Sequence, residues 1–467
     1  MAKIILINPD YYNDIFAESK VKAAISRGTP PLCLLTIAAP LIKSGHTVEI
    51  INLNVMYDRA FNLAEYIQTS RPDIVGVTST TPMIYKAYKL AEIVKSVDNT
   101  ITLICGGPHV SALPEQVLKE SLFDIAAAGE GDFVLRDIAE NGLSDQIPNI
   151  YFKHNNKIVH SVLQQNTVND LDQLPYPAYE LLDINRYFQP GLSSRKQPVA
   201  YIETSRGCYA KCIYCNKNIF GRRVRQKSPI RVVDEMEYLL KLGFGEIHII
   251  DDIFTANKIR ATAICNEIIQ RNLHFPWYPR GGLRVNNVSY ELLCLMKKAG
   301  CYRIPFGIES GSQRIIDRIN KQINLSQAVR AVKWAQQAGL ETETYFMAGL
   351  PGETEADLRA TIDFAIQLNP DYAKYAVSIP LPGTEMFYSM DSNGQILTKK
   401  WDKYTFSSSP RQIYRHDTLP WEIIDKYVEL FYRKFYFRPA FIFKTLIRTI
   451  RAGTFLEHLK GFFKTKW

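Results

Sequence analysis

The sequence predicts an α/β protein with two parallel-sheet domains and a helical C-terminal tail. The first domain is expected to be doubly wound and Rossmann-like, and the second to be a partial β/α barrel of about six units. Apolar strand-like runs alternate with helical stretches through residues 1–145 and again through 196–410, with a proline-containing connector between them. A chain of 467 residues with 46% hydrophobic and 22% charged residues has the length and composition for this organisation.

Five strand–helix pairs make up the predicted first domain. The expected strands are 3–8, 48–53, 74–78, 101–105 and 125–128, and the expected helices are 32–43, 63–69, 85–96, 114–120 and 133–140. Because parallel strands need crossover helices, this order predicts a doubly wound sheet whose ligands bind at the carboxyl ends of the strands. No glycine follows the first strand, where a G-x-G-x-x-G motif would stand, so NAD binding is not expected.

Residues 146–195 are expected to connect the domains. Asn155 and Asn156 predict a hairpin turn, and Pro175 and Pro177 predict a stiff, extended strap. In the second domain the expected strands are 199–205, 246–250, 277–283, 301–308, 342–347 and 372–379. Most of these strands end in charged, hydroxyl or glycine residues, and a β/α barrel builds its active site from the loops at that end.

A cysteine cluster follows the first strand of the second domain. Cys208, Cys212 and Cys215 are separated by three and two residues. Three thiolates on one loop can bind three irons of a four-iron cluster and leave the fourth iron open. A zinc knuckle would need a fourth ligand, and no second Cys-x-x-Cys or His pair follows at zinc-finger spacing. Eight cysteines without disulfide-framework spacing indicate a reducing compartment, so a cytoplasmic location is expected.

This C-x-x-x-C-x-x-C motif, with Tyr214 before the last cysteine, resembles the signature of the radical SAM superfamily. In that family the cysteines hold a [4Fe-4S] cluster that binds S-adenosylmethionine (SAM) and cleaves it to a 5′-deoxyadenosyl radical. The resemblance implies SAM contacts for Glu309, Asp252 and Arg284, and an electron donor such as flavodoxin or ferredoxin. The alternative for these three residues is a salt bridge at the barrel rim.

The first domain resembles the cobalamin-binding domain of one radical SAM class. The similar stretches are 30–32, 75–79, 105–110 and 129–132. The resemblance implies cobalamin contacts for Ser79, Thr80, Gly106, Gly107, Glu130 and Gly131. The D-x-H-x-x-G histidine of many cobalamin domains is missing after the first strand, and His46 and His109 lie elsewhere. Base-off cobalamin without a protein histidine ligand is therefore expected; the alternative is a sheet domain that has lost its ligand.

The tail carries nearly all of the net charge. Residues 433–467 hold nine basic residues and one acidic residue, a net +8 of the chain's +9. Such a distribution argues against a nucleic-acid partner, which would need a basic face. A helix over 440–451 would place Phe441, Ile442, Leu446, Ile447 and Ile450 on one face, with Lys444, Arg448 and Arg451 opposite.

This amphipathic helix has two interpretations. It can lie on an anionic membrane at the inner face, and the substrate would then be lipophilic. Alternatively, its apolar face packs on the barrel and the basic residues are merely solvated.

Nearly the whole chain resembles the B12-binding radical SAM class. The resemblance implies an enzyme, a C-methyltransferase that methylates an unactivated carbon of a small molecule with a [4Fe-4S] cluster, SAM and methylcobalamin. One alternative is an oxidative cyclase or rearrangement enzyme like the anaerobic magnesium-protoporphyrin ester cyclase, to whose tail residues 434–439 are similar. Another is a non-catalytic corrinoid-binding sensor. A methylthiotransferase would need three more ligating cysteines in the first domain, which has only Cys33 and Cys105.

Overall fold

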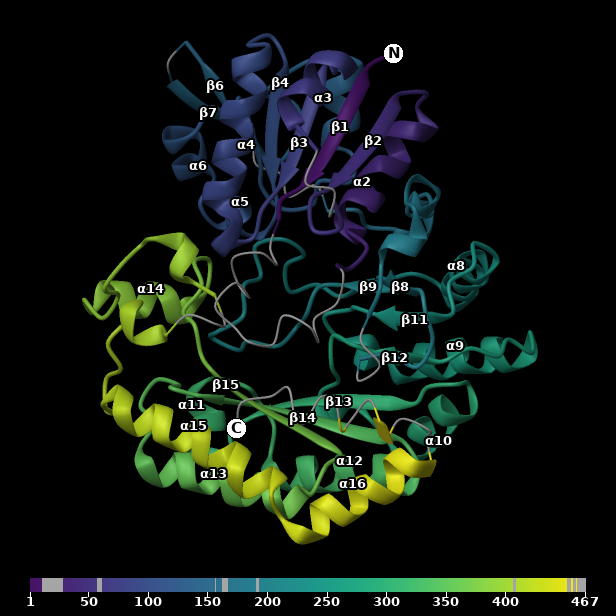
Figure 1. The fold of residues 1–467 in the computed structure, drawn as a ribbon, viewed down its shortest axis with the longest axis vertical. Coiled ribbons are helices and arrows are strands. Elements are labelled where there is room, and N and C mark those ends of the chain that lie inside the picture. The colour runs from purple at the N-terminus through teal and green to yellow at the C-terminus, as the bar shows by residue number, and fades with distance from the viewer. Residues whose placement is uncertain are drawn as a thin grey trace.

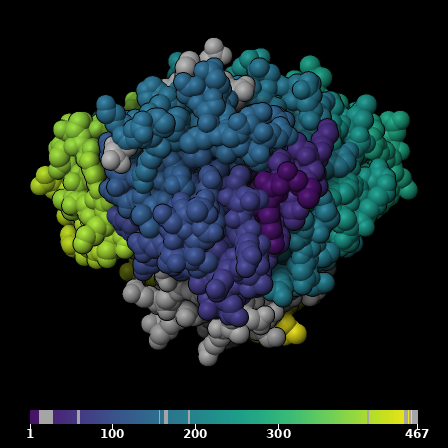
Figure 2. All heavy atoms as spheres, turned by 90° about the horizontal axis from the view of Figure 1, so that it is seen from above, coloured from purple at the N-terminus to yellow at the C-terminus, as the bar shows by residue number. Residues whose placement is uncertain are grey.

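The computed structural model describes residues 1–10, 28–56, 61–155, 157–161, 167–189, 193–405, 409–451, 455–456 and 459. Two domains are stacked along the long axis of the molecule, with the first domain above the second (Figure 1). Seen from above, the first domain occupies the centre and segments of the second domain extend beyond it on two sides (Figure 2). The carboxyl ends of the first-domain strands therefore face the second domain.

A seven-stranded sheet in the order β2-β1-β3-β4-β5-β6-β7 forms the first domain. Its strands are β1 (Lys3–Asn8), β2 (Thr47–Asn52), β3 (Ile74–Thr78), β4 (Thr102–Gly106), β5 (Ile125–Ala127), β6 (Ile150–His154) and β7 (Lys157–His160). Its helices are α2 (Leu32–Lys43), α3 (Leu63–Ser70), α4 (Ile84–Val97), α5 (Pro108–Ala112), α6 (Pro114–Glu120) and α7 (Val134–Asn141). Strands β1 to β5 pair in parallel, which confirms the predicted doubly wound sheet.

The hairpin of β6 and β7 belongs to this sheet and not to a free connector. β6 pairs antiparallel with β5, so the hairpin covers what would otherwise be the open edge of β5. Asn155 turns the chain with φ 48°, as a tight turn requires, and Asn156 lies outside the described residues. We propose to count residues 146–160 with the first domain.

Six parallel strands in two sheets form the predicted partial barrel. The first sheet contains β8 (Val199–Ile202), β11 (Glu246–Ile249) and β12 (Trp277–Pro279), and the second contains β13 (Arg303–Glu309), β14 (Glu341–Ala348) and β15 (Tyr372–Val377). Bridges from Trp277 to Cys301 and from Leu283 to Phe306 join the two sheets. β12 ends earlier than predicted because the backbone at Gly281 approaches that of Asp251, where a Cβ would lie 2.2 Å from the carbonyl oxygen.

Helices cover the outside of these strands. They are α8 (Pro229–Lys241), α9 (Lys258–Gln270), α10 (Tyr290–Lys298), α11 (Gln313–Arg318), α12 (Leu325–Gln337) and α13 (Glu355–Leu368). Helix α14 (Glu385–Ser392) instead buries Met386, Phe387 and Met390 in an apolar cluster with residues of the first domain. Alternate residues of β11, Ile247 and Ile249, are fully buried in one apolar cluster with Val233 and Met236 of α8. The hydrophobic core thus lies between strands and helices, and the other face of β11 presents polar residues.

Helix α15 (Trp421–Tyr436), which the sequence analysis did not predict, closes the edge of the barrel. The hydroxyl of Tyr432 accepts from the backbone N–H of Tyr375 at 3.2 Å and donates to its carbonyl at 3.1 Å. Tyr436 does the same at Ala373, at 3.0 and 2.7 Å. These hydroxyls satisfy backbone groups that a further strand would otherwise pair, so the barrel ends at β15.

Helix α16 (Pro439–Arg451) lies with its basic side toward the barrel. Lys444 and Arg448 bind the Asp371 carboxylate at 3.2 and 3.0 Å. Phe441, predicted to share the apolar face, is instead buried against Phe435. The exposed apolar side chains are Ile442, Phe443, Leu446, Ile447 and Ile450. The predicted apolar face therefore packs on the barrel only through Phe441, and its other four members are exposed. Lys444 and Arg448 are paired with Asp371, not merely solvated.

The remaining aromatic and basic residues of the tail, 460–467, lie outside the described residues. Within the ranges described, no helix is long and apolar enough to cross a membrane.

Candidate active site between the two domains

The three cysteines lie on a loop between β9 (Ser205–Arg206) and β10 (Arg225–Gln226). Cys208 and Cys212 are buried, and Cys215 is half-buried. Gly207 opens the loop with φ 87°, where a Cβ would lie 2.2 Å from the Arg223 carbonyl oxygen. Only glycine can therefore make this turn. The cysteines pack with Ile253 and Ala256 in one small apolar cluster.

Cationic side chains surround the thiols. Arg284 Nη1 lies 3.9 Å from Cys212 Sγ. Burial alone would lower the pKa of Lys217, but the nearby Cys215 and Cys208 thiols outweigh it and the pKa is raised. In the described part of the chain, no three His, Cys, Asp or Glu side chains converge as they would on a single metal ion. A four-iron cluster makes a different demand, because each thiolate binds its own iron. The three thiols and their cationic neighbours therefore fit a [4Fe-4S] cluster.

Glu309 ends β13 in a strained conformation. Its φ of 74° lies in the left-handed region, which side chains other than glycine rarely adopt. Its Oε1 lies 2.7 Å from Lys321 Nζ, and that ammonium also donates to the Tyr214 hydroxyl at 3.1 Å. Gly307 leaves room for the carboxylate, since a Cβ there would lie 2.8 Å from Glu309 Oε1. Lys321 thus ties Glu309 to the residue that precedes Cys215.

Arg284 and Asp252 lie on either side of the cluster loop. Arg284 Nη2 donates to the carbonyl of Lys321 at 2.5 Å, so part of this guanidinium is engaged by the protein itself. Asp252 is exposed, and its Oδ2 accepts from the Gly207 N–H at 3.1 Å. The neighbouring Asp251 is buried and accepts from both Thr204 and Ser205, so Asp252 has the more accessible carboxylate of the pair.

A cavity of about 470 Å³ lies between the carboxyl edge of the first sheet and the second domain. The first domain lines it with Asn8, Thr29, Asn54, Thr80, Thr81, Pro82, Met83 and Pro108, and the second domain with Asn216, Ile379, Leu381, Pro382 and Tyr404. Asn216 directly follows Cys215 in the sequence. The cavity therefore adjoins the cluster loop on one side and the predicted cobalamin edge on the other.

The predicted cobalamin residues have different structural roles. Gly107, with φ 107°, must be glycine because a Cβ would lie 2.7 Å from the Ser79 carbonyl oxygen. Ser79 is buried, and its hydroxyl donates to the Thr80 carbonyl at 3.0 Å. Thr80 is exposed to the cavity, and a Cβ at Gly106 would have no neighbour closer than 3.8 Å. The edge is thus shaped by Ser79 and Gly107, while a side chain at Gly106 would meet Ala127 only at ordinary contact distance.

Glu130, predicted to contact cobalamin, lies in a buried ion-pair network. Its carboxylate is buried and pairs with Arg225 through both oxygens and with Arg206 at 3.1 Å. Asp132 binds the same Arg206 guanidinium at 2.6 and 2.9 Å. We call Arg206, Arg225, Glu130 and Asp132 the interdomain clamp. The clamp engages both oxygens of Glu130, and the cobalamin contact predicted for this residue stays a prediction. Gly131 lies between the two acids, where a Cβ would meet only Ile37 at 3.5 Å.

Neither His109 nor His46 is among the residues that line the cavity. The His109 ring is fully buried beside Trp401, and its Nδ1 lies 3.3 Å from the Thr81 hydroxyl. Burial lowers the pKa of His109 to about 4, so the ring is neutral. His46 lies before β2, at the opposite edge of the sheet, where its Nδ1 accepts from the Ala2 N–H.

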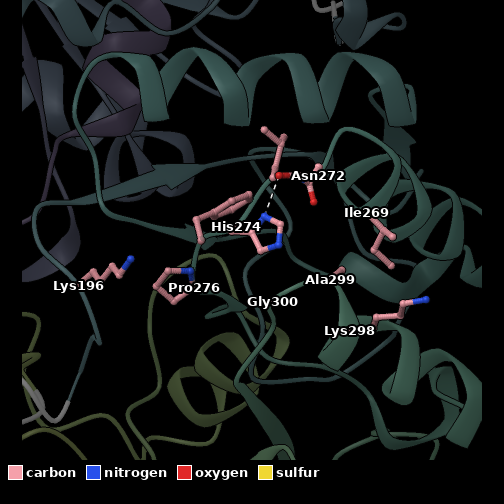
Figure 3. Close-up of a pocket in the computed structure, with 10 residues that line it drawn as sticks. Lys196, Ile269, Asn272, His274, Pro276, Lys298, Ala299 and Gly300 are labelled. Carbon is pink, nitrogen blue, oxygen red and sulfur yellow. Dashed lines mark hydrogen bonds between the residues drawn. The ribbon is translucent and has the colours of Figure 1, made fainter.

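A second cavity, of about 450 Å³, lies at the other end of the barrel. Its lining residues precede β8, β12 and β13, as Lys196, His274 and Gly300 illustrate (Figure 3). The His274 ring is held there by the Asn272 carbonyl at 2.8 Å. Since β/α barrels build their active sites at the carboxyl ends of the strands, this cavity is not the candidate site.

Sequence reasoning missed Lys321 and assigned no role to Arg206 or Arg225. A signal existed only for Arg206, which directly precedes the glycine of the cysteine loop. Lys321 is 12 residues from Glu309, at no motif spacing, and only the folded chain brings them together.

A cysteine-loop barrel that faces a doubly wound domain across one cavity defines a cofactor-dependent radical enzyme. Comparison with known proteins agrees. The radical SAM superfamily profile matches residues 202–365, and the B12 binding domain profile matches residues 19–139. An uncharacterised methyltransferase of Pyrococcus horikoshii is 34% identical over 95% of this chain and 94% of its own. The chain belongs to the radical SAM superfamily, among the members that carry a B12-binding domain.

Two further similarities concern a cyclase sequence and the fold of a solved structure. The anaerobic magnesium-protoporphyrin IX monomethyl ester cyclase of Rubrivivax gelatinosus is 29% identical over 94% of this chain and 78% of its own. The fold is similar to that of the radical SAM methyltransferase TsrM from Kitasatospora setae, solved with cobalamin and a [4Fe-4S] cluster bound. The TM-score is 0.67 at 20% identity, over 84% of this chain and 75% of that one.

Proposed function

We propose that this enzyme is a cobalamin-dependent C-methyltransferase that acts on an unactivated carbon of a small molecule. The observation that carries the proposal is the shared cavity, which Asn216 of the cluster loop and Thr80 of the first-domain edge both line. Radical formation and methyl delivery must meet at one carbon, so both cofactors need to face the same space. The 34% identical relative is named a methyltransferase, which supports the same reaction class.

Each cofactor has candidate residues. Cys208, Cys212 and Cys215 would hold the [4Fe-4S] cluster, which supplies the electron that cleaves SAM. Carboxylates accept hydrogen bonds from ammonium and ribose hydroxyl groups, so Glu309 and Asp252 are the proposed SAM acceptors. Arg284, beside Cys212, is the proposed partner of the SAM carboxylate.

Cobalamin, which supplies the methyl group when bound, would lie along Thr80, Gly106, Gly107 and Gly131, at the edge that Ser79 shapes. Thr80, which is exposed to the cavity between the domains, supports this placement. Buried His109 and distant His46 support a base-off form without a protein histidine ligand.

Two partners are part of the proposal. A flavodoxin or ferredoxin would supply the electron. The membrane would bind α16 through its five exposed apolar side chains, which are 36% to 65% exposed. Binding there would hold the enzyme at the inner face of the membrane and give it access to a lipophilic substrate.

Counting the two SAM products tests the reaction. The protein is reconstituted without oxygen and supplied with cobalamin, reductant and SAM, and S-adenosylhomocysteine and 5′-deoxyadenosine are measured together. We expect both products, with 5′-deoxyadenosine lost in Cys212→Ala and S-adenosylhomocysteine lost without cobalamin. Sustained formation of 5′-deoxyadenosine without S-adenosylhomocysteine would rule out methyl transfer.

The second candidate is a radical SAM cyclase or rearrangement enzyme. The 29% identity to the magnesium-protoporphyrin ester cyclase over most of both chains favours it. The same product count separates the two, because a cyclase forms 5′-deoxyadenosine without S-adenosylhomocysteine. A corrinoid-binding sensor would keep its function in Cys208→Ala, whereas either enzyme would lose it.

A further inference from the structure

The inner face of the barrel is polar. The residues of β11 that alternate with its buried isoleucines are Glu246 and His248, and both are fully buried. Phenolic and charged side chains of neighbouring strands contact them: the Tyr201 and Tyr278 rings lie 5.4 and 4.3 Å from the His248 ring. Barrel interiors of this type are usually packed with branched aliphatic residues. This interior, which we call the lumen, is therefore built for something other than packing.

Each lumen carboxylate already has a partner. Glu246 accepts from the Tyr302 hydroxyl at 2.7 Å and from His248 Nε2 at 2.6 Å. Glu341 pairs with Arg303 at 2.9 Å and with Arg195 at 3.1 Å. Glu343 pairs with Lys374 at 2.7 Å. Each of these three carboxylates is therefore already engaged by a partner other than Arg280.

Arg280, directly after β12, is a lumen cation without a carboxylate partner among the described residues. Its Nη1 donates to the Tyr201 hydroxyl at 3.0 Å and lies 3.4 Å from His248 Nδ1. Because His248 Nε2 faces Glu246, Nδ1 is the free acceptor of the ring. Nε and Nη2 of Arg280 have no partner in the described chain, so one edge of the guanidinium fork is left unused.

Two tyrosines near Arg280 have hydroxyls without a hydrogen bond among the described residues. The hydroxyls of Tyr278 and Tyr345 make no hydrogen bond within the described residues, and each can donate one. Burial alone would lower the pKa of Arg280, but nearby Tyr278, Tyr201 and Tyr345 outweigh it and the pKa is raised. The guanidinium is charged in a half-buried position, because arginine keeps its proton in proteins.

We propose that Arg280 binds an anionic oxygen group of the substrate, a carboxylate or a phosphate, with Tyr278 and Tyr345 as additional donors. A guanidinium fork matches either group in bidentate fashion. The Gly281 N–H donates to the Ile249 carbonyl at 3.3 Å, which places Arg280 at the carboxyl end of the barrel, level with Asp251 and Asp252. The inference rests on the proposed function for the reaction itself and adds the chemical class of the substrate.

Paired probes test this assignment by calorimetric titration of the full chain, without SAM. Indole-3-acetate is compared with indole-3-acetamide, and phenyl phosphate with its neutral dimethyl ester. We expect wild type to prefer one anion over its neutral counterpart by about tenfold or more. Arg280→Met should abolish that preference and Arg280→Lys should keep part of it. The control is Arg330→Met, which removes an exposed charge on α12. Whichever pair shows the preference identifies carboxylate or phosphate.

Three results would overturn the assignment. The first is that the wild-type protein shows no preference for the anion in either pair. The second is that the preference for the anion survives in Arg280→Met. The third comes from a separate titration with SAM. If Arg280→Met loses as much affinity for SAM as for the anion, then Arg280 binds the SAM carboxylate. Arg280→Lys keeps the charge and provides a second variant if Arg280→Met does not fold. These titrations involve no turnover, so a failed product count leaves their result standing.

Discussion

Arg206 Nη1 lies 2.6 Å from Asp132 Oδ2, and both side chains are almost fully buried between the two domains. Arg206 is two residues before Cys208, and Asp132 follows the last parallel strand of the first domain. Charge-assisted bidentate contacts fix both distance and orientation. The interdomain clamp therefore joins the cluster loop directly to the edge where cobalamin is proposed to bind.

Replacing Arg206 should destabilise the protein strongly. Arg206→Met leaves Asp132 buried without a counter-ion and removes one of the two cations at Glu130. Breaking a buried pair in this way typically costs ~3–5 kcal/mol of unfolding free energy. Urea unfolding of the variant and of wild type, both without cofactors, measures this loss of unfolding free energy. Lys119→Met, which removes an exposed pair with Glu115, should change little. Equal stability of Arg206→Met and wild type would show that the clamp does not hold the domains.

Replacing Lys321 should weaken SAM binding. Lys321 is the cation that holds the buried Glu309 carboxylate at 2.7 Å, so Lys321→Met leaves that carboxylate without its ion pair and free to turn. Losing a group that orients a ligand typically costs ~10–100-fold in affinity. Equilibrium binding of SAM to the iron-loaded protein measures the change. Lys399→Met, which removes an exposed pair with Asp391, is the control. Unchanged SAM affinity in Lys321→Met would argue against Glu309 as a SAM ligand.

Replacing exposed residues of α16 should reduce membrane binding. Ile442 and Ile450 are 52% and 60% exposed, whereas Lys444 and Arg448 are held by Asp371. Ile442→Ser combined with Ile450→Ser removes apolar surface that would enter the lipid, and should lower affinity for phosphatidylglycerol vesicles about tenfold or more. Co-sedimentation measures this.

The control for the membrane prediction is Ile259→Ser, which removes an exposed apolar side chain of α9. If the double variant binds vesicles as well as wild type does, then α16 is not the contact.

Local periodicity predicted the elements well. The bounds of α2, α6 and β3 agree with the prediction to the residue, because each is a local apolar or amphipathic stretch whose ends the sequence itself marks. The cluster-binding loop could likewise be predicted from the spacing of the three cysteines alone. The role of Glu130 could not be predicted, because its partner Arg225 is 95 residues away.

The tail shows the same limit of local information. Helical spacing gave α16 two faces, but Asp371 decides which face meets the barrel, and no pattern in the tail encodes that contact. α15 is specified by backbone groups of β15 that its tyrosines satisfy, which also depends on the folded chain.

Glu353 should make stability depend on pH. It is fully buried, and its Oε2 accepts from the N–H groups of Gly349 and Leu350 at 2.7 and 3.2 Å, so it shapes the loop after β14. Burial raises the pKa of Glu353 to about 8, from a usual value of 4.5, although the two N–H groups oppose that. Between these values the folded protein keeps a proton that the unfolded chain has lost. Stability therefore falls as pH rises through this window, by up to ~1.4 kcal/mol per pH unit.

Glu353→Gln isolates this effect. Glutamine keeps a side-chain oxygen for the Gly349 and Leu350 N–H groups but cannot ionise, so we expect a shallower fall in stability between about pH 5 and 8. Urea unfolding of both proteins at several pH values in that range gives the two slopes. The loss of wild-type stability relative to Glu353→Gln accumulates through this range, so the difference in unfolding free energy should change most between its lower and its upper end. Parallel slopes would show that Glu353 does not carry the extra proton, and that another buried group sets the pH dependence.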